Sequence, residues 1–370
     1  MIKNTIAYSE TRDKYKAFDE VSGKIDKEGS PLLIIFFSPF EGFDFFSHKL
    51  HKQYENSIVI GSSSTTSYSP FGYSDQAFTA LAFYDGIECF ADVLLEVTHY
   101  PMKYASKIED ALGSFDNLKN TVCIEFTTSF GRCEELVQDT FRSVLESKKI
   151  PIVGGTAGSD ALTSPTAVSL NGTVYSEACV FVLIKNLNGK IFTYKENLFK
   201  PSNRFVTSTD VDCDERIVYE FDGRPAAEVV SEITNVPIKE LKESISFYPL
   251  GRLTGEDIYI TCPDRIMPDG SITYFARIYN RTKMTLLEKD NFEEVWAQTA
   301  EIIKKEIPNP SVVFGVNCAK RAALFKRENR NGDFNNELLD NYGNFLCMSG
   351  FGEQIKYEHF NLTLVLCVFE

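Results

Sequence analysis

The sequence contains no apolar run as long as the roughly 18 residues that a membrane-spanning helix needs. Its first residues, MIKNTIAYSETRDKYKAF, lack the apolar core of a secretory signal peptide. We therefore expect a cytoplasmic chain with no membrane insertion.

Histidine is scarce, with four in 370 residues, and the chain has no HExxH, Walker A or GxGxxG motif. His48 and His51 stand three residues apart, a spacing that could chelate a metal. The adjacent Lys49 and Lys52 favour an exposed helix face instead, so we predict no metal site. No Ser-His-Asp arrangement or carboxylate pair can be assigned, so we expect neither enzyme activity nor a cofactor.

Nine cysteines are scattered along the chain, and no two have CxxC spacing. Cys123, Cys179 and Cys367 lie inside apolar runs, where cysteine behaves as a small hydrophobic residue. An odd count without a disulfide framework is typical of a reducing compartment. The cysteines therefore also favour the cytoplasm.

Basic residues are outnumbered, 38 against 52 acidic ones, which gives a net charge of −14. Nucleic acids and anionic membrane surfaces are also negative, so neither is expected as a partner. An apolar content of 43% is ordinary for a soluble globular protein. The length suggests two domains, because domains usually span about 100–200 residues.

A pattern of strand, helix, strand and hairpin occurs three times, with first strands at 32–38, 121–129 and 311–318. The helix at 132–148 has apolar residues at helical spacing, and Asn171-Gly172 predicts a tight hairpin turn. Strands that alternate with helices favour parallel pairing, and hairpins add antiparallel strands. Any α/β protein alternates in this way, so the pattern does not decide whether the copies arose by duplication.

The character of the sequence changes between the second and third copies. Residues 237–290 are rich in strand-forming residues, and a helix is predicted at 291–306, ended by Pro308. We predict an α/β fold with α+β elements, in which the repeated units form mixed sheets. The two domains, 1–222 and 223–370, should pack closely, because no low-complexity linker separates them.

Two strand ends near the carboxyl end of the chain carry polar residues. Asn317 and Cys318 end one apolar run, with Arg321 just beyond, and Gly352-Glu353 follow another. Ligands in α/β folds bind at the carboxyl ends of strands, so these residues predict a pocket for a small polar molecule. A packed cysteine and an arginine paired with a nearby carboxylate would explain the same residues, and both interpretations stay open.

Small residues follow two earlier strands, at Gly61–Thr66 and Gly154–Gly158. Hydroxyl groups and free backbone N–H groups can cradle an anion, which makes Ser62, Gly154 and Gly155 ligand candidates. Ordinary loop chemistry is the alternative.

These motifs in this order resemble the FIST family, a name expanded here as F-box and intracellular signal transduction. IPIVGGTAGSD at 150–160 and RFVTSTDVDCDERIVYEFDGRPAAEVV at 204–230 resemble the N-terminal FIST domain. NCAKR, GFGE and the closing strand resemble the C-terminal one. The resemblance covers most of the chain.

The resemblance implies a sensory module that binds a small polar ligand, with amino acids as the suggested class, between the two halves or at strand ends. It would signal through a separate partner of the chemoreceptor, kinase or cyclase type. Arg321 would hold the ligand carboxylate and Glu353 its ammonium group, and Arg321→Ala should abolish binding with little loss of stability. The family motifs carry over to Asn317, Cys318, Arg321, Gly352, Glu353, Asn361 and Thr363.

Three alternatives stay open. A haem-binding gas sensor of the same family would take an axial ligand from His48, His51, His99, His359 or Cys318. A cysteine-dependent enzyme would use Cys318 as its nucleophile, with His359 as a candidate base. A pure scaffold is the third.

Overall fold

The computed structural model describes residues 2–96, 101–129, 132–160, 164–255 and 257–370. The chain divides into two compact units. The first unit comprises Met1–Glu196, Trp296–His359 and Leu364–Glu370, and the second comprises Asn197–Val295 and Phe360–Thr363. Each unit is thus built from segments that are separate in the sequence. The predicted boundary between residues 222 and 223 divides the chain only once, and it stays a prediction.

The first unit contains the three predicted copies, and the mixed α/β class is confirmed. Each copy has two parallel strands joined through helix. The first strands are almost wholly buried, as expected of parallel strands covered on both faces. The elements are β2 (Leu33–Ser38), α2 (Phe43–Gln53) and β3 (Ile58–Ser63); β8 (Thr121–Thr127), α4 (Glu134–Leu145) and β9 (Ile152–Thr156); and β22 (Val312–Cys318), α8 (Ala319–Arg327), α9 (Asn331–Tyr342) and β23 (Phe345–Gly350).

A short hairpin follows each parallel pair and joins the sheet of another copy. The hairpin of the first copy pairs with β23, that of the second with β3, and that of the third with β9. The three copies are therefore linked in a cycle, which the sequence pattern did not reveal. The hairpins are β4 (Thr66–Ser69) with β5 (Gly72–Ser74), β10 (Val168–Leu170) with β11 (Thr173–Tyr175), and β24 (Gly352–Ile355) with β25 (Glu358–Phe360).

Longer strands complete three six-stranded sheets among the described residues. In each sheet one long strand pairs antiparallel with the first strand of the parallel pair. A second long strand pairs with the other edge of that long strand. The long strands are β1 (Lys3–Ser9), β6 (Phe78–Asp85), β7 (Ile87–Leu95), β12 (Ala178–Asn186), β13 (Ile191–Asn197) and β26 (Thr363–Phe369).

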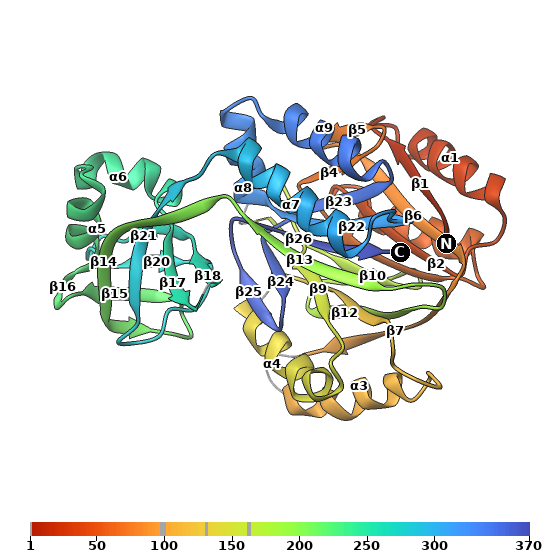
Figure 1. The fold of residues 1–370 in the computed structure, drawn as a ribbon, viewed down its shortest axis with the longest axis horizontal. Coiled ribbons are helices and arrows are strands. Elements are labelled where there is room, and N and C mark those ends of the chain that lie inside the picture. The colour runs from red at the N-terminus through yellow and green to blue at the C-terminus, as the bar shows by residue number, and fades with distance from the viewer. Residues whose placement is uncertain (1, 97–100, 130–131, 161–163, 256) are drawn as a thin grey trace. The chain divides into compact units, whose positions relative to one another are not determined.

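Helices cover the outer faces of these sheets. Figure 1 shows α1 (Lys14–Ile25), the pair α3 (Ala105–Leu112) and α4, and the pair α8 and α9 on three sides of the strands. The sequence analysis missed β1, α1 and α3. The N-terminus of α1 had a readable signal, because the Asp13 side chain accepts hydrogen bonds from the backbone N–H groups of Tyr15 and Lys16.

The three copies meet in an aromatic core and a ring of backbone hydrogen bonds. Phe37, Phe126 and Phe314, one from each first strand, have ring centroids 5.3–6.1 Å apart and are fully buried. At the strand ends, each copy donates one backbone hydrogen bond of 2.9 Å to the next. The donors and acceptors are Thr65 N to Ser349 O, Phe351 N to Thr156 O, and Gly158 N to Ser63 O.

Two helix predictions need adjustment. The helix predicted at 132–148 is α4, which continues as the 3-10 turn η4 (Glu146–Lys148). The helix expected after the first strand of the third copy is two helices, α8 and α9. They are separated at Asn329, whose positive φ of 57° interrupts the helix.

The second unit is a mainly antiparallel sheet with two helices. Its core gathers apolar residues from the strands and from both helices, including Val218, Phe221 and Leu241. The region predicted as strand from 237 begins instead with a helix. The elements are β14 (Phe199–Asp212), β15 (Ile217–Phe221), β16 (Arg224–Pro225), α5 (Ala226–Thr234), α6 (Ile238–Ser244), η5 (Ile245–Phe247), β17 (Leu250–Thr254), β18 (Asp257–Thr261), β19 (Pro263–Ile266), β20 (Ile272–Tyr274) and β21 (Lys283–Lys289).

The helix predicted at 291–306 is α7 (Phe292–Glu306), along which the chain returns from the second unit to the first. Among the described residues, none of the helices is long and apolar enough to cross a membrane.

Candidate ligand site at the ends of the third parallel pair

The predicted strand-end residues Asn317 and Cys318 lie where β22 ends and α8 begins. β22 and β23 run in register, with Asn317 opposite Ser349 and Cys318 opposite Gly350. The Asn317 Nδ2 donates a hydrogen bond of 3.3 Å to Ser349 Oγ, whereas its buried Oδ1 has no partner. Since α8 starts directly after Cys318, its first turn carries Arg321 over these strand ends.

Arg321 is fully buried and forms an ion pair with Glu196, through a hydrogen bond from its Nη2 to Glu196 Oε1. The Nε and Nη1 groups of Arg321 are buried without a partner. Phe325 and Phe334 lie over the guanidinium, with ring centroids 5.2 and 5.4 Å from its central carbon. The structure therefore contains the arginine–carboxylate pair that the sequence left open, and it also leaves two guanidinium nitrogens unsatisfied.

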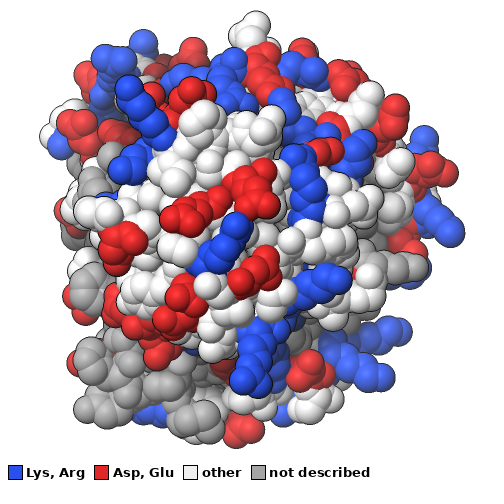
Figure 2. Space-filling view, turned by 90° about the vertical axis from the view of Figure 1, so that its left-hand side faces the viewer, with Lys and Arg blue, Asp and Glu red and all other residues white. Residues whose placement is uncertain are grey.

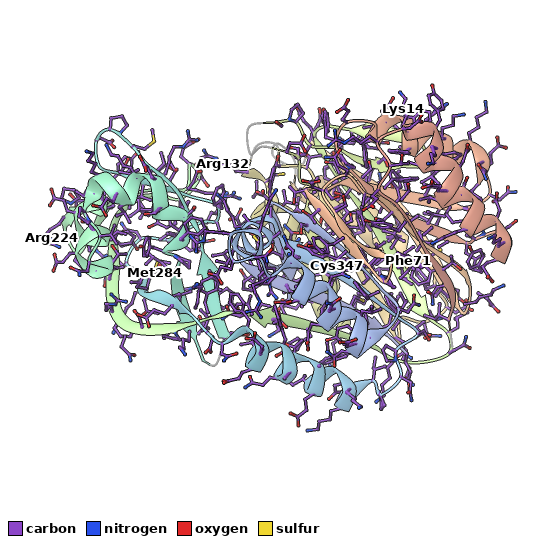
Figure 3. The ribbon with its side chains drawn as sticks, turned by 90° about the horizontal axis from the view of Figure 1, so that it is seen from above. Lys14, Phe71, Arg132, Arg224, Met284 and Cys347 are labelled. Carbon is purple, nitrogen blue, oxygen red and sulfur yellow. The ribbon has the colours of Figure 1, made fainter. Side chains whose placement is uncertain are left out.

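The surroundings of Arg321 combine a thiol and a phenol. Burial raises the pKa of the Cys347 thiol, the Arg321 charge opposes this rise, and Glu353 and Glu196 add to it. Burial also raises the pKa of Tyr68, whose hydroxyl donates a 2.9 Å hydrogen bond to Asn331 Oδ1. Cys347, labelled in Figure 3, lies on β23 beside Gly315, and a Cβ at Gly315 would come within 3.1 Å of its sulfur.

Sequence reasoning missed Glu196, Tyr68 and Cys347 as members of this site. Glu196 lies one residue before the end of β13, 125 residues before Arg321, and Tyr68 comes from the first copy through β4. Neither residue stands in a motif. The hairpin of the first copy brings Tyr68 to the third sheet, and the pairing of β13 with β26 brings Glu196 there. Both pairings are long-range, so no local signal could have revealed these residues.

Glu353 lies on β24, opposite Gly155 on β9, and is fully buried. Gly154 and Gly155 lie inside β9, which has neighbouring strands on both sides, rather than in a loop. A Cβ at Gly155 would lie 3.3 Å from the Gly352 carbonyl oxygen, so packing also explains this glycine. Ser62 is likewise inside β3, and its hydroxyl donates to the Ser63 carbonyl at 3.0 Å. Their role as ligand contacts stays a prediction.

Asn361 and Thr363 belong to the second unit. The Asn361 Oδ1 accepts a 3.3 Å hydrogen bond from the Cys262 backbone N–H, and its Nδ2 donates to the Phe360 carbonyl at 3.1 Å. Thr363 begins β26. The structure gives Asn361 a role in holding its own unit, and a role in binding stays a prediction.

The candidates for nucleophilic, haem and metal chemistry are mostly buried or dispersed. Cys318 is 1% exposed. The His359 Nδ1 lies 3.0 Å from Gln354 Nε2, its buried Nε2 has no partner, and a Cβ at Gly352 would lie 2.9 Å from that Nε2. His48 is exposed on α2, and His99 lies outside the described residues. Among the residues that are described, no group of three or more His, Cys, Asp or Glu could hold a metal ion.

The second copy contains a separate buried polar cluster around Glu125. Its Oε2 accepts hydrogen bonds from Thr127 Oγ1 at 2.7 Å and Cys179 Sγ at 3.3 Å, and its Oε1 accepts one from Gln138 Nε2 at 3.1 Å. Burial raises the pKa of Glu125 to about 7, although these hydrogen bonds oppose the rise. A side chain at Gly154 would overlap Glu125, so the glycine makes room for the carboxyl group.

A surface pocket of about 750 Å³ lies at the N-terminal ends of α1 and α2. Arg12 and Lys14 line it together with Asp13, Glu41 and Asp160, so its charges are mixed. Figure 2 shows a similar mixture on one face of the molecule, where coloured acidic and basic side chains are interspersed. The net charge of −14 is therefore not gathered into one acidic patch on that face.

The FIST N domain matches residues 31–224, and the FIST C domain matches residues 226–356. An uncharacterized protein of Methanocaldococcus jannaschii is 26% identical over 213 residues, which cover 53% of this chain and 40% of that protein. The expansion of the family name through the F-box is wrong. FIST domains are sensory domains of signal transduction. Because the two matches span most of its length, the chain belongs to the FIST family.

Proposed function

We propose that this chain is a cytoplasmic sensory module whose Arg321 site binds a small ligand bearing a carboxylate, with amino acids as the first class to test. The observation that carries the proposal is the pair of buried, unpartnered nitrogens on Arg321, Nε and Nη1. Buried polar groups in native proteins almost always have partners, so these guanidinium nitrogens are available to bind a ligand. A carboxylate matches the donor geometry of a guanidinium, and this match favours a carboxylate ligand.

A second charge supports the amino-acid class. Glu353 is fully buried, and Glu353, Glu196 and Arg321 all influence the pKa of Cys347. Arg321 and Glu353 thus act on the same thiol with opposite signs. A ligand with a carboxylate and an ammonium group could engage Arg321 and Glu353 together.

Entry to the site requires a structural change. Arg321 is fully buried, and Phe325 on α8 and Phe334 on α9 lie over its guanidinium. We therefore infer that a ligand reaches these nitrogens through a movement of α8 or α9, which carry the two rings. Such a shift is the kind of response that a sensor needs, because binding is then coupled to a change of conformation.

A thermal-shift screen tests the proposal. The purified chain is heated with amino acids, other small carboxylates and hemin, alongside Arg321→Lys and Arg216→Lys variants. Arg321→Lys keeps the charge but loses the planar fork of donors. Arg216 is also buried but lies in the second unit, so its variant controls for the loss of a buried guanidinium. A ligand that binds the folded state raises the unfolding midpoint by mass action.

We expect an amino acid or carboxylate to raise the midpoint of the wild type and of Arg216→Lys, and not that of Arg321→Lys. An undiminished rise in Arg321→Lys would show that the ligand binds elsewhere. A screen without any rise would remove the proposal.

A haem-binding gas sensor is the alternative that the family resemblance suggests. His359 does not fit as the axial ligand in this conformation, because its ring lies against the Gly352 backbone and its Nδ1 contacts Gln354. The hemin arm of the screen checks this alternative, since a rise with hemin and a Soret band would favour haem over the Arg321 site.

The cytoplasmic location and the separate signalling partner are also part of the proposal. All nine cysteines lie within the described residues, and each is a thiol, which supports a reducing compartment. The partner, of the chemoreceptor, kinase or cyclase type, follows from the sensory character of the family. Affinity capture with the wild type and Arg321→Lys, each with and without the amino acid mixture, would show whether a partner responds to the site.

A further inference from the structure

The chain passes between its two units at residues that belong to the Arg321 site. The first unit gives way to the second after Glu196, and it resumes at Trp296. Both residues are buried, at 3% and 4% exposure. Glu196 contacts Arg321 directly, and Trp296 contacts the aromatic rings that lie over Arg321.

Glu196 is the direct connection. Its carboxylate pairs with the Arg321 guanidinium, and the next residue, Asn197, already belongs to the second unit. A buried ion pair fixes the position of its partners, because breaking it leaves an uncompensated charge away from water. The outgoing end of the first unit is therefore held by the candidate ligand-binding residue itself.

Trp296 is the connection through aromatic rings. Its ring centroid lies 5.8 Å from that of Phe325 and 6.0 Å from that of Phe334. These are the two rings that lie over the Arg321 guanidinium. A shift of α8 or α9 would therefore also disturb the packing of Trp296.

A third point at which the chain changes unit also lies at the Arg321 site. The chain leaves the second unit again after Thr363, and Leu364, the first residue back in the first unit, pairs with Asn317 across the β26–β22 ladder. Three residues at which the chain changes unit thus lie at this site. Glu196 contacts Arg321, Trp296 contacts the two rings over Arg321, and Leu364 pairs with Asn317 at the end of β22. This coincidence sets the site apart from the Glu125 cluster, whose hydrogen-bond partners lie within one copy.

We propose that ligand binding at the Arg321 site changes the conformation of the two chain segments that lead to and from the second unit. Glu196 would transmit the change to one segment and Trp296 to the other. The inference rests on the proposed function, because it describes how the ligand that Arg321 binds would produce a signal. A ligand carboxylate on Nε or Nη1 places a second negative charge next to Glu196 and weakens the Arg321–Glu196 pair. The shift of α8 or α9 that admits the ligand loosens Trp296 at the same time.

Hydrogen exchange of the full chain, read by mass spectrometry, tests the coupling without a known ligand. Glu196→Gln removes the charge from one connection while keeping the size of the side chain. Trp296→Phe reduces the packing at the other connection. Glu88→Gln serves as the control, because Glu88 also pairs with a cation in the first unit, Lys185, but lies on β7, where the chain does not change unit.

We expect each variant to affect both connections. Glu196→Gln should speed exchange several-fold at 195–199 and also at 292–299, and Trp296→Phe should do the same in reverse, because coupling between two sites is reciprocal. Glu88→Gln should change neither segment. If each variant changes only its own segment, the coupling is overturned.

The two proposals fail in different ways. Local changes alone, with an Arg321-dependent thermal shift still present, would overturn the coupling and leave the ligand site standing. Coupled exchange without any Arg321-dependent thermal shift would overturn the ligand site and show a purely structural link between the connections. If a variant does not fold, as judged by circular dichroism, the other one still tests the coupling in one direction.

Discussion

Arg321 and Glu196, 125 residues apart in the sequence, form an ion pair in which both side chains are almost completely buried. This pair joins the first turn of α8 to the end of β13. Two unsatisfied nitrogens remain on the arginine, so the pair is a structural contact and a candidate ligand contact at once.

Removing one partner of this ion pair should strongly destabilise the fold. Arg321→Ala or Glu196→Ala should lower the free energy of unfolding by about 3–5 kcal/mol, because each leaves a buried charge without compensation. The sequence-based expectation of little stability loss in Arg321→Ala is revised for this reason. Urea unfolding measures the loss. The exposed pair Arg204–Glu288, at 43% and 51% side-chain exposure, is the control, and Arg204→Ala should cost no more than about 1 kcal/mol. Equal small losses in both pairs would contradict the burial argument.

The ring of backbone hydrogen bonds at the strand ends should tolerate no side chain at Gly350. A Cβ there would overlap the Thr156 carbonyl oxygen, which accepts the hydrogen bond from Phe351 N–H. Gly350→Ala should therefore lower stability by about 1–3 kcal/mol through overpacking. The matched change Gly23→Ala, in α1 with nothing within 4 Å of its Cβ, should raise stability by about 0.5–1 kcal/mol. Thermal or urea unfolding of the two variants measures both changes. A Gly350→Ala protein as stable as the wild type would contradict close packing around the ring of backbone hydrogen bonds.

Stability should fall as the pH rises through the titration of Glu125. Burial raises its pKa from 4.5 to about 7, so between these values the folded state holds a proton that the unfolded chain has lost. The free energy of unfolding should therefore fall from about pH 4.5 upward and level off above about pH 7, by roughly 3 kcal/mol from this residue.

Glu125→Gln isolates this contribution, because glutamine does not titrate. Its unfolding free energy, measured in urea from pH 4.5 to 8, should lack that part of the decline. The exposed Glu55→Gln should keep the wild-type profile. A Glu125→Gln profile as steep as the wild type would show that other groups cause the decline.

Cys318 should resist alkylation in the folded protein. It is 1% exposed, and buried thiols react slowly. Iodoacetamide labelling near neutral pH, mapped by mass spectrometry, should modify the partly exposed Cys213 first and Cys318 only after unfolding in urea. Rapid labelling of native Cys318 would instead support the cysteine-dependent enzyme.

Local patterns in the sequence were sufficient for most of the repeated elements. Apolar runs predicted β2, β8 and β22, helical spacing predicted α4, and Asn171-Gly172 predicted the hairpin of β10 and β11. These features depend on side-chain periodicity and turn conformation, which neighbouring residues determine. The start of α1 was missed although Asp13 is a regular N-cap and Phe18, Val21 and Ile25 are buried at helical spacing.

The sequence by itself determined the family, the three strand–helix–strand copies, and the placement of Asn317, Cys318 and Arg321 at a strand end. Tertiary structure alone decided that β4–β5, β10–β11 and β24–β25 pair with other copies, and that Glu196 rather than a neighbour meets Arg321. The physical reason is range. Backbone propensity acts over a few residues, whereas a buried charge takes its partner from whichever strand the packing of the whole unit brings beside it.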